Sequence, residues 1–471
     1  MIRRTDVSFV ITTAVILPAV AACWWFVAAA LRTPQLPDEP SAADPATVIE
    51  QFHQILVGSN PSRQRSLAYI DEQWQSSFTP MVVETIFMIR EHAFAGSLVQ
   101  LLVSRTGQSF GLDLDKWYDW IWDQDYEPHP LYADFKANLY GLIDPRFRAY
   151  FSSARPATIR LDEVRWGGIA QDGIPPLRRP LMLAAADATY LADDNIVFGI
   201  EVNGDARAYP KRIMGWHEMF VDEVGGVPVA GVFCALCGSM ILYKTEDHGV
   251  NHELGTSAFL YRSNKLMYDQ ATQSLWSTLR GRPVIGPLAA TGIALERLSV
   301  VTTTWGEWRS RHPDSRVLSL RTGHQRDYSE GAAYREYFAT DELMFIVPET
   351  DDRLKNKAEV LGLVFAEYPD DTLAITTAFL RANPVYHDAV GQIRLVMLTD
   401  RSGASRVYEA HGVRFKAWDQ GWTAVDAEGA SWIVSEDALT GRDGRRLARL
   451  PAHRAFWFGW YAAYPRTRLV K

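Results

Sequence analysis

Apolar and polar positions follow different rhythms in two stretches of the chain. From residue 47 to about 155, apolar side chains recur every three or four positions, for example at Val48, Phe52 and Ile55. This spacing is typical of helices with one buried face. From residue 156 onward, short runs rich in Val, Ile, Phe and Tyr alternate with Gly, Asp, Asn and Pro, which predicts strands and turns. We therefore expect an α+β, β-rich fold with a small helical domain before the strands.

The beginning of the chain is apolar enough to cross a membrane. No charged side chain occurs from Val7 to Leu31, and a helix of that length exceeds the hydrocarbon thickness of about 30 Å. Because Arg3 and Arg4 precede this run, the positive-inside rule places the N-terminus in the cytoplasm. We predict a transmembrane anchor over residues 1–32, single-pass in a bacterial cytoplasmic membrane, with the body of the protein extracytoplasmic.

Two other interpretations of this segment stay open. The residues up to Cys23 resemble a lipobox, so the segment is alternatively a lipoprotein signal or a cleaved signal peptide. The apolar run continues through Trp24 and Trp25, however, where a cleaved signal turns polar, which favours the uncleaved anchor. Residues 33–46 are rich in Pro, Ala and acidic residues and predict an extended linker.

The β-rich region contains a weak internal repeat. Matching residues in chain order pair Gly226, Gly238, Tyr243, Trp276, Trp305 and Trp308 with Gly391, Gly403, Tyr408, Trp432, Trp457 and Trp460. Gly and Trp have specific backbone and core roles. The repeat predicts two β-rich units, residues 156–357 with a connecting segment and residues 358–471, packed as a pseudo-symmetric pair.

The repeat also singles out three reactive side chains of the first unit. Under this alignment Cys234, Cys237 and His217 correspond to Thr399, Ser402 and Ala382. The second unit thus keeps the framework without the reactive groups. We infer that the three side chains are not needed for folding and belong to a site that occurs once per chain.

Charge and cysteine content narrow the class of protein. The chain has 48 basic and 56 acidic side chains, a formal net charge of −8, so it has no global basic field for nucleic acid. With three cysteines in 471 residues, a disulfide-rich scaffold is excluded. We expect no nucleic-acid partner.

A series of short motifs resembles one bacterial family. They include Asp172-Gly173-Ile174-Pro175, Asn203 to Pro210, Trp216-His217-Glu218, Phe233 to Ser239, Leu260 to Asn264, Ser274-Leu275-Trp276 and Thr303-Thr304-Trp305. From about Asp172 to the C-terminus, the chain resembles the family known as domain of unknown function 3179. The resemblance implies no activity, and Ala235 stands where the family usually has the proline of Cys-Pro-Leu-Cys.

The Cys234-Ala235-Leu236-Cys237 motif admits several kinds of chemistry. Strand-like residues follow it, which argues against the thioredoxin arrangement, in which the motif opens a helix. Dithiol redox chemistry on another fold stays open. Two thiolates and His217 would form an incomplete, soft ligand set that suits copper or another soft metal ion better than structural zinc. The alternative without any activity is a structural disulfide or a pair of buried thiols.

Two further groups of polar residues are candidates for binding. A possible pocket comprises Tyr261, Arg262, Ser263, Asn264, Tyr268 and Asp269, although polar residues in β-turns give the same pattern. His248 and His252 have a metal-ligand spacing for a helix, but Asp247-His248-Gly249 predicts a hairpin tip instead.

Two hypotheses of function follow. In the first, Cys234, Cys237 and His217 form a catalytic, thiol redox or copper-type metal site. In the second, the protein is a non-catalytic envelope module that binds a small-molecule ligand or a protein partner and contains a structural disulfide.

Overall fold

The structure is a computed structural model that describes residues 48–471. The predicted membrane segment, linker and Cys23 lie outside this range. Within it, none of the helices combines the length and the apolar character needed to cross a bilayer.

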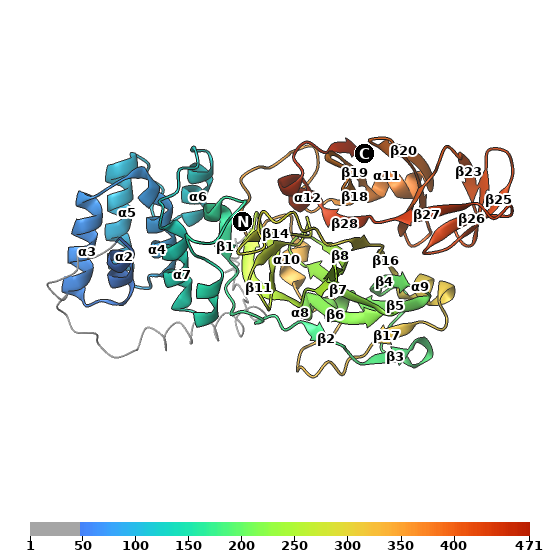
Figure 1. Cartoon of the computed structure of the whole chain (residues 1–471), viewed down its shortest axis with the longest axis horizontal. Coiled ribbons are helices and arrows are strands. Elements are labelled where there is room, and N and C mark those ends of the chain that lie inside the picture. The colour runs from blue at the N-terminus through green and yellow to red at the C-terminus, as the bar shows by residue number, and fades with distance from the viewer. Residues whose placement is uncertain (1–47) are drawn as a thin grey trace, which may run out of the picture.

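A helical domain lies at one end of the molecule (Figure 1), as the apolar spacing predicts. Its elements are α2 (Val48–Val57), α3 (Asn60–Glu72), η1 (Ser76–Phe78), α4 (Thr79–Met88), α5 (His92–Thr106), α6 (Leu114–Trp122), α7 (Tyr132–Gly141) and η2 (Pro145–Ala149). Aromatic and aliphatic side chains on the inner faces, such as Phe52, Leu98 and Trp117, form its core. That core continues into the neighbouring sheet through Phe259.

The central β-rich unit contains three five-stranded sheets and one two-stranded hairpin. Its strands are β1 (Val164–Trp166), β2 (Leu177–Arg178), β3 (Met182–Ala184), β4 (Ile196–Val202), β5 (Asp205–Pro210), β6 (Met219–Val224), β7 (Val227–Cys234), β8 (Ser239–Lys244), β9 (Glu246–Asp247), β10 (Val250–Asn251), β11 (Leu254–Tyr261), β12 (Asn264–Asp269), β13 (Leu275–Ser277), β14 (Arg282–Ile285), β15 (Arg297–Leu298), β16 (Val301–Thr304) and β17 (Arg316–Leu318). Its short helices are η3 (Leu161–Glu163), η4 (Ala185–Asp187), α8 (Lys211–His217) and α9 (Trp305–Arg311).

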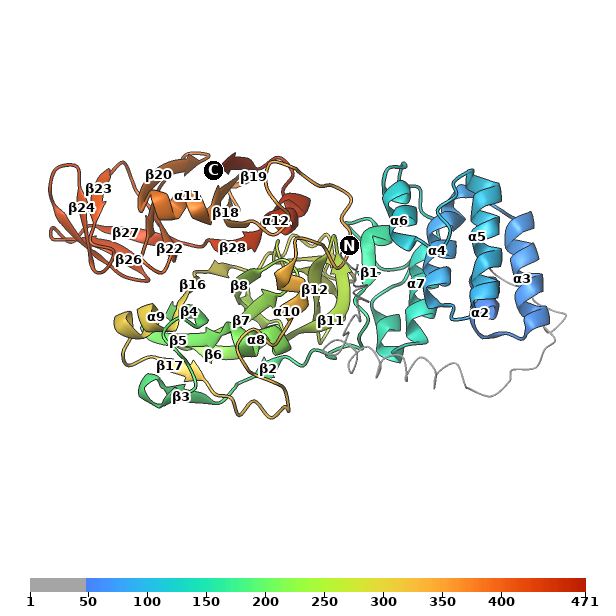
Figure 2. The same cartoon turned by 180° about the vertical axis from the view of Figure 1, so that it is seen from behind.

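An irregular connection from residue 319 to residue 358, with the short helix α10 (Arg335–Ala339), leads to the C-terminal unit. The strands of this unit are β18 (Glu359–Phe365), β19 (Tyr368–Thr376), β20 (Val385–Val390), β21 (Ile393–Thr399), β22 (Ser405–Glu409), β23 (Phe415–Trp418), β24 (Thr423–Asp426), β25 (Ser431–Val434), β26 (Ala438–Gly441), β27 (Arg446–Leu450), β28 (His453–Phe456) and β29 (Arg468–Val470). Its helices are α11 (Thr377–Ala382) and α12 (Trp457–Ala463). This unit lies alongside the central one in both views (Figures 1 and 2).

The two β-rich units contain sheets with the same strand order. In the order β16-β4-β5-β17 the pairings are antiparallel, antiparallel and parallel, and β28-β18-β19-β29 repeats them. In each sheet a tryptophan ring lies directly on a glycine. A Cβ atom would come within 2.2 Å of the Trp308 ring at Gly199, and within 2.2 Å of the Trp460 ring at Gly362. Only glycine permits either contact.

The turns follow local sequence rules. Asn203 and Gly204 both have positive φ in the tight turn between β4 and β5, as the Asn-Gly pair predicts. His248 and Gly249 do the same between β9 and β10. Since this hairpin exposes 93% of the His248 side chain whereas His252 is buried, the two histidines do not form a metal-ligand pair.

Candidate functional site

Cys234 and Cys237 lie in the tight turn that joins β7 to β8. Cys234 is the last residue of β7 and pairs with Ser239, the first residue of β8. Gly238 has a φ of 60°, which lets the chain reverse between them. Both cysteines are free thiols and buried, with exposed fractions of 1% and 0%. The structural disulfide of the second hypothesis is therefore not formed.

The two thiols form a hydrogen-bonded pair with different acidities. Burial alone would raise the pKa of Cys234, but hydrogen bonds from Cys237 and from the Lys265 backbone outweigh burial and lower this pKa. Burial together with the charge and hydrogen bond of Cys234 raises the pKa of Cys237 well above its usual range. The two pKa shifts have opposite directions, so Cys234 is the more readily ionised of the two thiols.

A second tight turn, between β11 and β12, surrounds Cys237. Cys237 Sγ lies 3.5 Å from the Ser263 carbonyl oxygen, and the Asn264 side-chain amide donates to Cys237 Sγ at 3.3 Å. Arg262 and Ser263 have φ values of 49° and 59°, which non-glycine residues rarely adopt. This is the geometry of a two-residue hairpin turn, and it places Ser263 and Asn264 against Cys237.

A cavity of about 70 Å³ lies beside Cys234. Its polar lining residues are Cys234, Thr256, Glu218, Lys265 and Tyr334, and its apolar ones include Ile169, Phe259, Leu260, Met344 and Phe345. A bulge in β11 forms part of the wall, where Ala258 has a φ of 73°. Because it has both apolar walls and polar groups, the cavity has the character of a small ligand site.

Glu218 and Lys265 form a buried ion pair on the cavity wall, with side-chain exposures of 5% and 8%. The Tyr334 hydroxyl donates to Glu218 Oε1 at 2.5 Å. Burial and the Glu218 charge raise the pKa of Tyr334 well above its usual range, so it remains a hydroxyl donor. The negative charge of Glu218 acts on both thiols and opposes their ionisation.

His217 does not join the thiols, contrary to the sequence prediction. Its Nδ1 contacts the Pro175 carbonyl at 2.9 Å and its Nε2 contacts the Tyr328 hydroxyl at 2.6 Å. A carbonyl only accepts, so Nδ1 donates and Nε2 accepts from Tyr328. Burial lowers the pKa of His217 to about 4. Both ring nitrogens are occupied, and between residues 48 and 471 no three His, Cys, Asp or Glu side chains are placed to share a metal ion.

The six residues of the predicted pocket separate into different environments. Ser263 and Asn264 contact Cys237, whereas Tyr261, Arg262 and Asn264 line a second cavity of about 20 Å³. Tyr268 donates to Asp172 Oδ2 at 2.5 Å, and Asp269 accepts from His252 Nδ1 at 3.0 Å. Of the six residues, the structure therefore places Ser263 and Asn264 beside the Cys237 thiol.

Three residues of the cavity, Glu218, Lys265 and Tyr334, were missed from the sequence. Glu218 directly follows the selected His217, and Lys265 directly follows the selected Asn264. A charged residue directly before the apolar residues Leu266 and Met267 of β12 is a signal for a buried partner, because an unpaired buried charge is costly. Tyr334 comes from the irregular connection, and no local pattern reveals its position.

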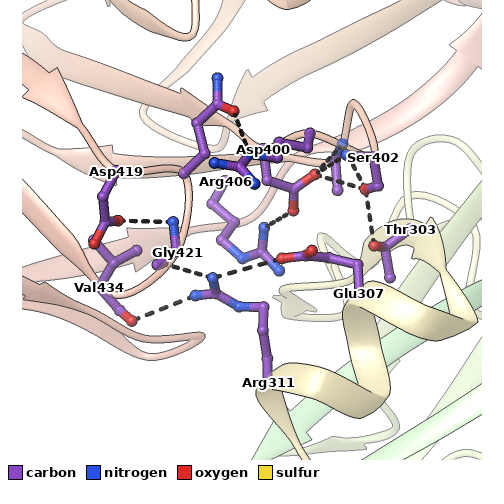
Figure 3. Close-up of polar contacts among 12 residues, drawn as sticks. Thr303, Glu307, Arg311, Asp400, Ser402, Arg406, Asp419, Gly421 and Val434 are labelled. Carbon is purple, nitrogen blue, oxygen red and sulfur yellow. Dashed lines mark hydrogen bonds and ion pairs between the residues drawn. The ribbon is translucent and has the colours of Figure 1, made fainter.

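Another buried polar cluster joins the two β-rich units, and it has a structural character. Figure 3 shows Arg311 of α9 extending toward Gly421 and Val434 of the C-terminal unit. Arg406 is fully buried and pairs with Asp400 at 2.7 Å and with Glu436 at 2.6 Å. Each buried charge has an opposite partner, as a stable interior requires.

The family comparison agrees with the motifs noted in the sequence. Residues 171–467 match the family model described as "Protein of unknown function (DUF3179)". No curated protein and no solved structure matches the chain. The matched region includes both thiols and most of the residues that line the cavity beside them. Since it covers more than half of the chain, the chain belongs to the DUF3179 family.

Proposed function

We propose that Cys234 and Cys237 form a dithiol redox site that exchanges electrons with a thiol or disulfide substrate. The observation that carries the proposal is the pair of free thiols in one tight turn, of which Cys234 borders the cavity and Cys237 does not. Thiol–disulfide exchange needs one thiol as a thiolate nucleophile and a second to resolve the mixed disulfide. The opposite pKa shifts of the two cysteines support these separate roles.

The exchange balances without a cofactor. The Cys234 thiolate attacks one sulfur of a substrate disulfide, a mixed disulfide forms, and the other substrate sulfur leaves as a thiolate. Cys237 then loses its proton and attacks the Cys234 sulfur, which releases the second substrate thiolate and leaves a Cys234–Cys237 disulfide. The substrate gains two electrons and the protein loses two. The proton that Cys237 loses passes to the substrate thiolate that is released.

We also propose that the protein is anchored in the membrane and that its two β-rich units are a duplication, as inferred from the sequence. A single-pass anchor from Val7 to Leu31 would place the dithiol outside the cytoplasmic membrane, where thiols and disulfides are exchanged in bacteria. The shared strand order of the two β-rich units supports a pseudo-duplication. Cys234 ends β7 as Thr399 ends β21, which supports a site present once per chain.

The test measures the redox state of each cysteine in the full-length protein. Reduced protein is equilibrated in glutathione buffers from about −320 to about −120 mV, trapped with an alkylating reagent, and analysed by peptide mass mapping. We expect a reversible Cys234–Cys237 disulfide that disappears in Cys234→Ser and in Cys237→Ser. Absence of this disulfide at every potential would reject the proposal.

The same variants separate the two other functions considered. Stoichiometric Cu(I) uptake by the reduced protein that is lost in both variants, without disulfide formation, would favour the soft-metal site. Lower thermal stability of the variants without exchange or metal uptake would favour an envelope module that binds a ligand or partner.

A further inference from the structure

Residues 342–350 cover the cavity beside Cys234 with apolar side chains. Met344 and Phe345 line this cavity, and Val347 packs in the same hydrophobic cluster as Cys234 and Cys237. Ile346 packs on the core of the helical domain. The stretch therefore lies between the thiols and the outside, and Met344 is 39% exposed.

Apolar packing and one cation–π contact, between the Arg165 guanidinium and the Phe345 ring at 5.7 Å, hold this stretch, whereas both of its ends are fastened by hydrogen bonds. In the described part of the chain, no hydrogen bond or ion pair involves residues 342–350. Immediately before it, the Asp341 carboxylate accepts from the backbone N–H groups of Asn356 and Lys357 at 3.1 and 2.9 Å. Immediately after it, the Asp351 carbonyl accepts from Trp457 Nε1 at 3.2 Å. A segment with few backbone hydrogen bonds opens at a lower free energy than the sheets around it.

The other walls of the cavity cannot open as easily. Ala258 and Leu260 belong to β11, and Lys265 belongs to β12, which pairs on both sides. Tyr334 is held by its hydrogen bond to Glu218 at 2.5 Å. Exposing Cys234 through these walls would break ladder hydrogen bonds or a buried polar contact, and displacing residues 342–350 breaks neither.

We propose that residues 342–350 form a flap that opens to admit a low-molecular-weight thiol or disulfide to Cys234. The flap is independent of redox chemistry, and only the class of substrate depends on the dithiol function proposed above. A cavity of about 70 Å³ has room for part of a small molecule. A disulfide on a folded protein would need the surrounding sheet to separate.

The test compares modification of Cys234 by a small and by a large reagent. Native, reduced full-length protein is treated with iodoacetamide or with a maleimide attached to a long polyethylene glycol chain, and Cys234 is followed by peptide mapping. We expect iodoacetamide to react faster than the protein unfolds and the large maleimide to react far more slowly. The double substitution Met344→Ala/Phe345→Ala removes the cover and should accelerate the iodoacetamide reaction about tenfold. Leu181→Ala, at a similarly exposed apolar residue elsewhere, is the matched control and should leave the rate unchanged.

Hydrogen exchange of the unmodified protein provides a second measurement that needs no variant. The amides of residues 342–350 should exchange much faster than those of β7. The flap is overturned if these amides exchange as slowly as β7, or if Cys234 reacts only at the rate of global unfolding. It is also overturned if both reagents react equally fast with the wild-type protein. Flap behaviour as expected, without exchange with oxidised glutathione, would reject the dithiol function and leave the flap in place.

Discussion

The backbone N–H of Phe456 donates to the carbonyl of Cys237 across 2.7 Å and thereby joins β28 to the turn that contains both thiols. The turn between β21 and β22 of the C-terminal unit in turn contacts β16 of the central unit, where the Ser402 and Thr303 hydroxyls lie 3.0 Å apart. Each unit supports a turn of the other. The C-terminal unit, which lacks the thiols, is therefore part of the structure that fixes their position.

Gly459→Ala tests this support. A Cβ atom at position 459 would lie 2.9 Å from Cys237 Sγ and 3.0 Å from its Cβ, so the α12 helix and the thiol turn would have to separate. We expect the free energy of unfolding to fall by about 1–3 kcal/mol, the usual cost of overpacking. Urea denaturation measures it. Gly96→Ala in α5 is the control, because no atom lies within 4 Å of its Cβ, and it should stabilise the helix by about 0.5–1 kcal/mol.

Lys265→Met tests the ion pair on the cavity wall. The substitution leaves the buried Glu218 carboxylate without its cation, and we expect a loss of about 3–5 kcal/mol in the free energy of unfolding. The double variant Glu218→Leu/Lys265→Met removes both charges and should recover most of that loss. Arg445→Ala breaks an ion pair whose side chains are more than half exposed and should cost less than about 1 kcal/mol. If the single and the double variant lose the same free energy of unfolding, Glu218 and Lys265 do not form a buried ion pair.

His217 predicts a specific pH dependence of stability. Burial lowers its pKa to about 4 in the folded protein, below the value of about 6.5 in the unfolded chain. The unfolded state therefore binds more protons between these values, so stability is complete above about pH 6.5 and is lost as the pH falls toward 4. The contribution is on the order of 3 kcal/mol.

Urea denaturation of the wild type and of His217→Asn at pH 7.5, 5.5 and 4.5 measures this effect. We expect the loss of stability on acidification to be smaller in His217→Asn. Burial likewise lowers the pKa of His453, to about 3, so part of the acid sensitivity should persist. The exposed His248 is the control, and His248→Asn should keep the wild-type pH profile. If His217→Asn has the same dependence of stability on pH as the wild type, the pKa of His217 does not differ between the folded and the unfolded protein.

Arg406→Met tests the polar cluster between the β-rich units. Arg406 is fully buried, and its removal leaves Asp400 without its cation and takes one cation from Glu436. We expect a loss of about 3–5 kcal/mol in the free energy of unfolding, as for other broken buried pairs. Arg309→Met, in an exposed pair with Asp193, should cost less than about 1 kcal/mol. A thermal melt of both variants gives the comparison, and similar melting temperatures would argue against a structural role for the cluster.

Features that depend on neighbouring residues could be predicted from the sequence. The turn at Asn203 and Gly204 forms because both positions need positive φ, which these residue types tolerate. The hairpin tip at His248 follows the same rule. Cys234 and Cys237 lie close together because only two residues separate them and both lie in one tight turn. The helical region follows from apolar spacings of three to four residues, and the strands follow from short runs rich in Val, Ile, Phe and Tyr between turn residues.

The position of His217 could not be predicted in this way. It ends α8, and the next residue, Glu218, takes the left-handed conformation with a φ of 56°. The chain therefore changes direction between two adjacent residues. His217 reaches Pro175 and Tyr328, while Glu218 reaches Lys265 and the cavity. Two residues adjacent in the sequence can therefore face different parts of the protein when they lie at the end of a helix, and the sequence does not show which of them faces the thiols.

The sequence alone determined the family, the helical and β-rich regions and the pair of thiols, because each depends on motifs or on contacts between residues close along the chain. Only the tertiary structure decided what surrounds the thiols. Glu218, Lys265, Tyr334 and the flap at 342–350 come from segments that are far apart in the sequence. They meet because the hydrophobic cores of several sheets bring their ends together, and burial is a property of the whole packed chain.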